Sequence, residues 1–376
     1  MESVGCLSKG VSERRSNNLD IVYGKMASRR AKKARYVLDS SSSSSSGGYT
    51  STESGSRSDP PKEETIVIKN IQDLIQFCID YEGDAIDWHM LWRLVPALIE
   101  LNSLVGMKKL KSDVVDIIVY HIQGLHVPDP KLKKTTEGEM YHCVIMGPPG
   151  VGKTTVAKIL AKVFAGIGIT KTDKITIAKK TDFIARYLGQ TEHKVAAFME
   201  KAKGGVLFID EAYSFGHPRD IDSYSKTIID MLNQHLSEDK KDFVCMIAGY
   251  EKELEESFFA VNPGLQRRFT KRFTVEEYSG EDLFEMLKRR VDKEGWTMEE
   301  GVKTKEFVSS KKESFPNYGG DIETYFGECK KAHALRILGL TLGKRVLTVE
   351  DLKNAHACFI RHSTKKRKSP PPGMFM

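Results

Sequence analysis

The chain has 376 residues, 40% of them hydrophobic and 29% charged, with a formal net charge of +7. This length and apolar content allow two or three folded domains with buried cores, which excludes a wholly disordered protein. The positive excess lies at the two ends, and residues 65–364 carry no net charge. Any contact with nucleic acid is therefore expected from the tails and not from the core.

The cysteines and the apolar stretches indicate the cellular compartment in which the protein is expected. The six cysteines are scattered without a C-x-x-C pair, and most lie among apolar neighbours, which predicts buried thiols in a reducing environment. No stretch reaches the roughly 18 apolar residues that cross a bilayer, and MESVGCLSKG lacks the apolar centre of a signal peptide. We expect an intracellular, cytoplasmic protein without membrane contact, with nuclear import as an alternative through the basic tails.

The first 64 residues are polar and contain a run of seven serines, residues 40–46. Such a composition buries too little apolar surface to offset the entropy of ordering, so we predict a disordered basic tail over 1–64. Within it, SRRAKKAR (28–35) is either a solvated basic run or a patch for nuclear import or an anionic surface.

Helix-spaced apolar residues begin near Thr65, in IQDLIQFCIDY, WHMLWRLVPALIELNSLVGM and KLKSDVVDIIVYHIQGL. They predict a helical approach to the core over 65–135. Strands and helices then alternate over 136–279, with strands expected at 141–147, 174–178, 205–210, 242–250 and 271–277. This alternation predicts an α/β fold with a doubly wound parallel sheet.

After Ser279 the pattern predicts helices only. One begins at the capping sequence SGED and carries the apolar stripe of Leu283, Met286, Leu287 and Val291. Another begins at TVED, with Leu352, Ala355, Phe359 and Ile360 on one face. We therefore expect a small all-α lid domain over 280–362 and a basic, proline-rich tail over 363–376.

The stretch GPPGVGKTT fits the pattern G-x-x-x-x-G-K-[ST] of a phosphate-binding loop. In such a loop backbone N–H groups surround the phosphates, the lysine reaches the β and γ phosphates, and the next hydroxyl binds Mg²⁺. Here these are Lys153 and Thr154. The predicted ATP-binding residues of the loop are Gly147, Pro148, Pro149, Gly150, Val151, Gly152, Lys153, Thr154 and Thr155.

A second motif, GGVLFIDEAYSF, places Asp210 and Glu211 at the end of a predicted buried strand. In an ATPase of this kind the first acid holds the Mg²⁺ shell and the second orients and deprotonates the attacking water. A kinase does not need the second acid, so its presence favours hydrolysis of ATP. No serine, cysteine or histidine grouping suggests a covalent nucleophile or a zinc site.

Five segments together are similar to the AAA+ ATPases, and specifically to the CbbX or CfxQ-like branch, which includes the red-type rubisco activases. The segments are GPPGVGKTT, YLGQTEHKV, GGVLFIDEAYSF, MIAGYEKELEESF and NPGLQRRFTKRFTVEEYS. The resemblance covers roughly residues 104–360 and is most specific up to Ser279. It extends to CfxQ-like proteins of large DNA viruses as much as to bacterial ones.

The resemblance implies a homo-oligomeric ring, usually a hexamer, with ATP bound between subunits. SLVGM matches the segment that packs on adenine, so it implies contacts from Val105 and Gly106, although these residues also suit simple packing. Arg268 matches the arginine finger that completes a neighbour's site, with Arg267 as its close competitor. The implied catalytic residues are Glu211, Lys153 and Arg268.

Two positions depart from the wider superfamily. Tyr250 stands where a polar first sensor, often Asn, follows the fourth strand, although AGY fits this branch. The second sensor, an arginine near the start of a lid helix, is replaced by Gly320 and Asp321, with Arg336 on the same helix as a substitute to be tested.

The segment ARYLGQ resembles the pore loop with which such rings grip an extended polypeptide. Tyr187, Leu188 and Gly189 would form it, because an aromatic ring packs on any backbone and glycine lets the loop bend. Alternatively, Tyr187 and Leu188 are core residues of a helix face.

We expect a Mg²⁺-dependent ATPase that remodels a protein client of unknown identity. The sequence leaves two alternatives open. One is a P-loop ATPase linked to nucleic acid, which the basic tails favour but the neutral core opposes. The other is a nucleotide-gated assembly scaffold, which the missing lid arginine would permit.

Overall fold

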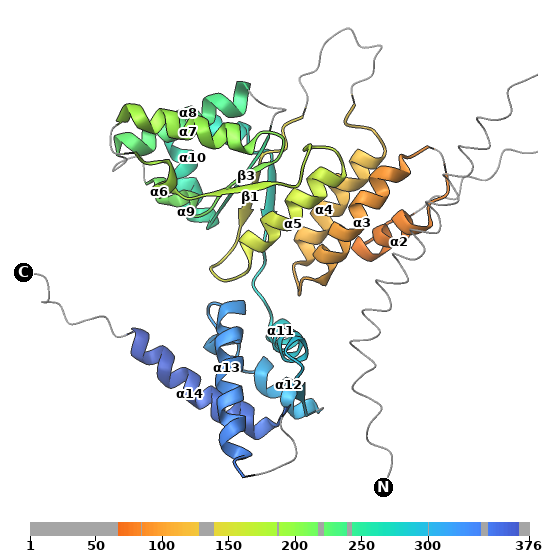
Figure 1. Ribbon diagram of the computed structural model, residues 1–376, viewed down its shortest axis with the longest axis vertical. Helices are drawn as coiled ribbons and strands as arrows, with labels where there is room; N and C mark the ends of the chain where they lie inside the picture. The colour runs from red at the N-terminus through yellow and green to blue at the C-terminus, as the bar shows by residue number, and fades with distance from the viewer. Residues whose placement is uncertain are drawn as a thin grey trace, which may run out of the picture.

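The computed structural model describes residues 67–83, 85–127, 139–185, 188–216, 222–238, 243–299, 301–339 and 345–367. The predicted disordered tail, the basic run at 28–35 and the terminal residues 368–376 lie outside this range. The described chain forms a central sheet between two groups of helices, followed by a helical lid (Figure 1).

In the described chain, five parallel strands form the sheet in the order β2-β3-β4-β1-β5. All five coincide with predicted strands, although each is shorter than expected. Their bounds are β1 (Cys143–Met146), β2 (Ile175–Ala178), β3 (Val206–Ile209), β4 (Val244–Gly249) and β5 (Lys271–Thr274). Because all strands run in one direction, the residues that follow β1, β3 and β4 meet at one edge of the sheet, where ligands bind in open α/β folds.

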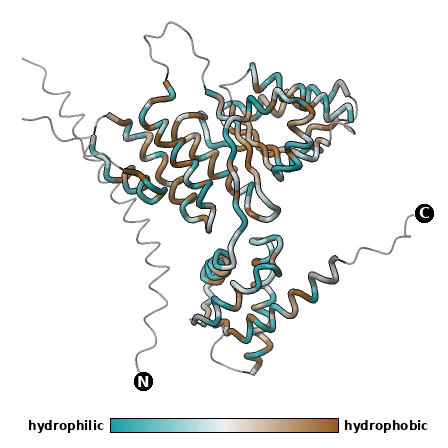
Figure 2. The backbone as a smooth tube through the Cα atoms, turned by 180° about the vertical axis from the view of Figure 1, so that it is seen from behind, coloured by the Kyte–Doolittle hydropathy of each residue, from teal (hydrophilic) through white to brown (hydrophobic). Residues whose placement is uncertain are grey.

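Helices cover both faces of the sheet, which confirms the doubly wound arrangement. The helices and 3₁₀ turns of the sheet region are α5 (Lys153–Gly166), α6 (Lys180–Phe183), α7 (Leu188–Ala202), η1 (Ala212–Phe215), α8 (Ser223–Glu238), α9 (Glu251–Glu256), α10 (Phe258–Val261) and η2 (Pro263–Arg267). Neighbouring residues of β1 point to opposite faces: Cys143 and Ile145 join the core around α5, whereas Val144 and Met146 join the core around α7 and α8. Both faces are apolar, as expected of a parallel sheet, and hydrophobic residues are concentrated along the strands and the helices next to them (Figure 2).

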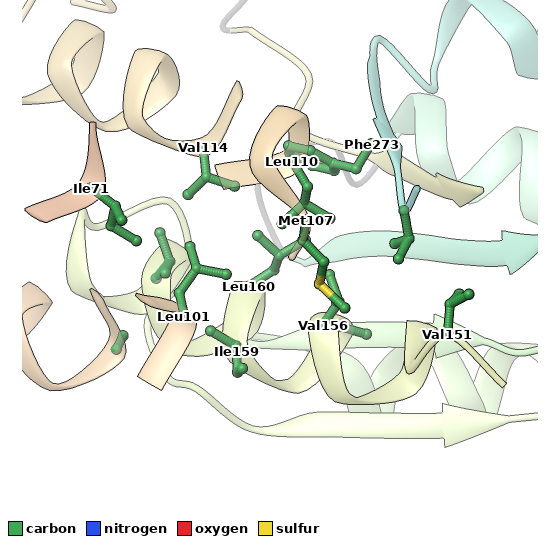
Figure 3. Close-up of a cluster of buried hydrophobic side chains, with 14 of the residues drawn as sticks. Ile71, Leu101, Met107, Leu110, Val114, Val151, Val156, Ile159, Leu160 and Phe273 are labelled. Atoms are coloured by element: carbon green, nitrogen blue, oxygen red, sulfur yellow. The ribbon is translucent and has the colours of Figure 1, made fainter. Parts of the chain in front are cut away.

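Ahead of the sheet, the described residues form three helices: α2 (Ile71–Asp80), α3 (Trp88–Ser103) and α4 (Lys108–Ile122). Of these, α3 packs on α5, and α2 packs on the side of α3 away from α5 (Figure 1). Gly166 brings α5 close to α3, because a Cβ at this position would lie 2.9 Å from Cδ2 of Leu94. Leu110 of α4, Leu160 of α5 and Phe273 of β5 belong to the same buried cluster (Figure 3). The helical approach predicted from the sequence therefore shares one core with the sheet.

The lid follows β5 and is helical, as predicted, with one small addition. Its elements are α11 (Gly280–Lys293), β6 (Thr297–Met298), α12 (Val302–Ser309), η3 (Lys312–Ser314), α13 (Gly319–Arg336), β7 (Val346–Leu347) and α14 (Val349–Arg367). Ser279 caps α11 in a capping box with Asp282, as SGED predicts. The two-residue strands β6 and β7 pair in parallel and were not predicted.

The last helix departs from its predicted pattern in two respects. Leu352, Ala355 and Phe359 are buried, whereas Ile360, which was grouped with them on one face, is 41% exposed. The helix also continues to Arg367, into the segment predicted to be a tail.

Candidate functional site

The phosphate-binding loop connects β1 to α5 and depends on glycine at several positions. Gly150 and Gly152 have φ angles of 75° and 91°, in the left-handed region that favours glycine. At Gly147 a Cβ would lie 2.6 Å from the carbonyl oxygen of Val275. The backbone path of the loop therefore requires the glycines of the motif.

Lys153 begins α5 and turns its ammonium group back onto the loop. Its Nζ donates hydrogen bonds to the carbonyl oxygens of Gly147, at 2.7 Å, and Pro148, at 2.9 Å. Burial lowers the pKa of Lys153, whereas the negative charges of Asp210 and Glu211 act in the opposite direction. The predicted phosphate-binding charge thus lies within the loop.

Thr154 and Asp210 come from different elements and meet beside the loop. Thr154 is the second residue of α5, and Asp210 directly follows β3. The Thr154 hydroxyl donates a 3.2 Å hydrogen bond to Oδ2 of Asp210. A hydroxyl next to a carboxylate is an oxygen donor set that fits Mg²⁺, so these residues would hold the ion together with ATP oxygens.

Glu211 follows Asp210 in a left-handed conformation, with a φ of 54°. Its backbone N–H donates to Oδ1 of Asp210 at 3.1 Å, and its side chain is exposed. The turn therefore directs one acid towards Thr154 and leaves the other accessible to water. The arrangement suits the roles expected of a metal-binding acid and a general base, which stay predictions.

The proposed adenine-contacting segment lies between α3 and α4. Gly106 has a φ of 63°, and a Cβ there would lie 3.4 Å from the ring of Tyr278. Tyr278 is buried, and its hydroxyl donates a 2.8 Å hydrogen bond to the carbonyl oxygen of Val151 in the phosphate-binding loop. We did not predict Tyr278 from the sequence, although its place just before the SGED cap marks the junction of sheet and lid.

Tyr250 follows β4 and lies beside the loop lysine. The Nζ of Lys153 is 4.8 Å from the centroid of the Tyr250 ring. The ring of Tyr213, in η1, stacks on Tyr250 with centroids 5.2 Å apart and planes inclined by 24°. Tyr213 was missed because nothing in the sequence marks a contact between residues after two different strands.

The two arginines at the end of η2 have different surroundings. Nε of Arg268 donates to Oγ of Ser237 at 2.6 Å, and its Nη1 donates to the carbonyl oxygen of Gly264 at 2.7 Å. Arg267 is exposed. The half-buried Arg268 side chain is thus held by its own subunit, and its role towards a neighbour stays a prediction.

The predicted pore loop lies partly beyond the described chain. Tyr187 is outside the described residues, and Leu188 and Gly189 begin α7.

The start of α13 lies against the phosphate-binding loop. A Cβ on Gly150 would lie 2.2 Å from the carbonyl oxygen of Asn317, and one on Gly319 would lie 3.8 Å from the carbonyl oxygen of Gly150. Arg336 is the last residue of this 18-residue helix, about 25 Å along its axis from the first turn. Its guanidinium binds Asp351 through Nε at 2.7 Å and Nη2 at 3.0 Å. Arg336, named as a substitute to be tested, therefore lies away from the loop and does not take the place of the second sensor.

The fold and the site together define a class. A parallel sheet with a phosphate-binding loop after β1 and an acidic pair after β3 is that of a P-loop nucleotide-binding protein. Residues 143–277 match the model of the ATPase family associated with various cellular activities (AAA). The chain belongs to this AAA family.

Two relatives support this assignment. A cfxQ-like protein of Acanthamoeba polyphaga mimivirus is 35% identical over 270 residues, which cover 70% of this chain and 64% of that protein. Stage V sporulation protein K of Bacillus subtilis is 30% identical over 246 residues, which cover 64% of this chain and 75% of that protein. The match thus spans somewhat less than two thirds of the viral relative. The identity of 35% to this protein confirms the predicted CfxQ-like resemblance.

Among solved structures, Thermotoga maritima RuvB is 16% identical, with a TM-score of 0.48 over 69% of this chain and 71% of that chain. A likeness of this degree carries no argument about function. Within the described ranges, no helix is long and apolar enough to span a bilayer.

Proposed function

We propose that the chain is a Mg²⁺-dependent ATPase that hydrolyses ATP to ADP and phosphate. The observation that carries this proposal is the contact between Thr154 and Asp210, with Glu211 as the next residue on an exposed turn. Bound Mg²⁺ would neutralise charge on the β and γ phosphates. Lys153 would bind these phosphates, and Glu211 would take a proton from the attacking water.

We further propose that the subunits form a ring, a hexamer by family resemblance, in which Arg268 acts on the neighbour's ATP. The position of Arg268 directly after η2 supports this, because its half-buried side chain is oriented by hydrogen bonds to Ser237 and Gly264. In this arrangement the lid over 280–362 responds to the state of the phosphate-binding loop in the core over 136–279, because the start of α13 lies at Gly150. The ring would use hydrolysis to remodel a protein client, gripped by Tyr187, Leu188 and Gly189.

The first experiment tests hydrolysis and assembly. Glu211→Gln should bind ATP, lose at least about 100-fold in turnover, and gain mass in solution when ATP is present. Glu256→Gln, an exposed acid on α9, is the matched control and should behave like the wild type. If Glu211→Gln hydrolysed ATP at the wild-type rate, the assignment of Glu211 as the general base would be contradicted.

The second experiment tests the client. Wild-type ATPase rate is measured with an unfolded protein or with single-stranded DNA added, and we expect stimulation by the protein alone. Tyr187→Ala should lose this stimulation and keep basal hydrolysis. Stimulation by DNA together with indifference to protein would favour the nucleic-acid-linked alternative instead.

A nucleotide-gated scaffold is the second candidate. It is favoured by the engagement of Arg336 with Asp351, because the turn at 317–319 that leads into α13, and not an arginine of that helix, then lies at the loop. A scaffold would assemble with ATP but show no client-stimulated turnover, so the same two experiments separate it from a remodelling ATPase.

A further inference from the structure

Two tyrosines form an aromatic stack at the phosphate-binding loop. Tyr250 follows β4, and Tyr213 lies in η1 after β3. Their ring centroids are 5.2 Å apart and their planes are inclined by only 24°. The stack lies beside Lys153, whose Nζ is 4.8 Å from the centroid of Tyr250.

The Tyr250 ring supplies an interaction that the loop backbone does not. Lys153 Nζ already donates to two loop carbonyls, and an aromatic face within about 6 Å adds a cation–π attraction. The aromatic ring therefore acts on the lysine.

Tyr213 is half-buried and lies in a turn that packs against the sheet. Its neighbours Ala212 and Phe215 in η1 are fully buried, which fixes the turn against the sheet. The turn is closed by a 2.8 Å hydrogen bond from the backbone N–H of Ser214 to the carbonyl oxygen of Glu211. Burial raises the pKa of Tyr213 to about 12, and the charge of Glu211 and the Tyr250 hydroxyl act in the same direction. Tyr213 thus remains a neutral ring that backs Tyr250.

We propose that Tyr213 is a positioning residue of the nucleotide site, which holds the Tyr250 ring against the ammonium group of Lys153. This inference rests on the proposed ATPase function. Because Glu211 and Tyr213 belong to one rigid turn, the stack connects the turn that carries the general base to the lysine that binds phosphate. A displacement of the turn that carries Glu211 therefore shifts the ammonium group of Lys153, and a displacement of Lys153 shifts the turn.

The test compares the kcat/KM for ATP of the full-length wild type with that of Tyr213→Leu, Tyr213→Phe and Tyr250→Leu. Tyr213→Leu removes the stack and should lower kcat/KM about five-fold, the change that a cation–π contact at a partly exposed site is worth. Tyr213→Phe keeps the stack and should stay within about two-fold of the wild type. Tyr120→Leu, which removes a half-buried tyrosine at the far end of α4, is the control and should have no effect.

A double variant separates positioning from simple stability. Because Tyr213 acts through Tyr250, adding Tyr213→Leu to Tyr250→Leu should cause no further loss of kcat/KM. Multiplicative losses in the double variant would overturn the proposal, as would equal losses in Tyr213→Phe and Tyr213→Leu. If Tyr213→Leu does not fold, Tyr213→Met, which fills similar space without a ring, replaces it.

Binding of a fluorescent ADP analogue distinguishes this inference from the proposed function. If the wild type binds the analogue but hydrolyses no ATP, the proposed ATPase function fails. The same variants are then compared by their affinity for the analogue, and Tyr213→Leu should bind it more weakly than the wild type and Tyr213→Phe. If the wild type hydrolyses ATP and Tyr213→Leu matches it in kcat, KM and analogue affinity, only the inference about Tyr213 fails.

Discussion

The Tyr278 hydroxyl donates a 2.8 Å hydrogen bond to the backbone carbonyl oxygen of Val151. Tyr278 lies between β5 and α11, where the sheet region passes into the lid. Its ring also makes an edge contact with Tyr318, whose centroid is 5.5 Å away, just before α13. One buried side chain therefore touches the phosphate-binding loop and the lid, and it also lies beside Gly106.

Tyr278→Phe removes this hydrogen bond and keeps the ring. The Val151 carbonyl then loses a buried partner, which should cost about 1–3 kcal/mol of the free energy of unfolding. Affinity for ADP should fall as well, because the loop is no longer fixed to the junction. Calorimetric unfolding and ADP titration measure the two effects.

Tyr325→Phe is a matched control for this prediction. Its hydroxyl donates a 2.8 Å hydrogen bond to the carbonyl oxygen of Leu352, and the residue is fully buried inside the lid. It should lose similar stability without any change in ADP affinity. Unchanged affinity in Tyr278→Phe as well would mean that its hydrogen bond is only structural.

Gly150→Ala tests the contact between loop and lid. At a φ of 75° alanine costs about 1–2 kcal/mol in any surroundings. Here the Cβ would also lie 2.2 Å from the carbonyl oxygen of Asn317, so the start of α13 has to move away. We expect faster proteolysis of the lid in the absence of nucleotide, together with a lower unfolding midpoint.

Gly168→Ala provides the comparison, because Gly168 has a φ of 82° and a Cβ there would meet no atom of the described residues within 4 Å. It should show the backbone cost alone and leave the lid as resistant to protease as in the wild type. Equal proteolysis in the two variants would argue against the loop–lid contact.

Much of the sheet was predictable because its signals are local. Each strand is a short apolar run, and the loop motif and the acidic pair each lie within a dozen residues. The contact between Thr154 and Asp210 also follows once the strands are taken to be parallel, since both residues then lie at the same edge of the sheet.

The contacts that sequence reasoning missed join residues far apart in the chain. Tyr213 and Tyr250 belong to different strand ends, and Asn317 reaches Gly150 across the junction of sheet and lid. Periodicity predicts which face of an element is buried, but not which partner it meets. Ile360 lay at the border of an apolar stripe, where a small rotation of the helix exposes it.

The buried carboxylate Asp351 predicts acid sensitivity of the lid. Burial opposes its ionisation, but hydrogen bonds from Arg336, the Thr348 backbone and His333 outweigh this effect and lower its pKa to about 2. Because the folded pKa is below the unfolded value, the stabilisation is present above about pH 4 and is lost as the pH falls towards 2. It amounts to about 2–3 kcal/mol at neutral pH.

Asp351→Ala should remove this stabilisation at pH 7 and flatten the acid dependence below pH 4. With Trp88 and Trp92 replaced by Phe, denaturation followed by tryptophan fluorescence reports on the lid, because the remaining Trp296 ring packs edge-on against His333, 5.2 Å away. Asp222→Ala is the control for location: the pKa of Asp222 is also lowered to about 2, but this exposed residue lies outside the lid, at the start of α8. Its carboxylate accepts from the Ser225 backbone, so its loss should cost only about 1 kcal/mol and leave the lid unchanged. A lid as stable in Asp351→Ala as in the wild type would contradict the role of this network.

Arg268 and Arg267 allow a direct test of catalysis between subunits. Arg268→Ala should keep ATP binding and lose about 10³-fold in kcat, because a cation at the γ phosphate stabilises the charge of the transition state. Arg267→Ala is the control, because Arg267 is exposed and the hydrogen bonds to Ser237 and Gly264 belong to Arg268. Its kcat should stay near that of the wild type.

Mixing two inactive variants shows whether Arg268 acts across an interface. Lys153→Ala cannot bind ATP productively but retains Arg268, whereas Arg268→Ala has an intact loop. If the arginine completes the neighbour's site, mixed assemblies should regain activity, since a loop from one variant meets an arginine from the other. The mass in solution shows whether the two variants have assembled together. If such mixed assemblies hydrolyse no ATP, Arg268 acts only within its own subunit. In that case, its hydrogen bonds to Ser237 and Gly264 describe a structural residue of η2.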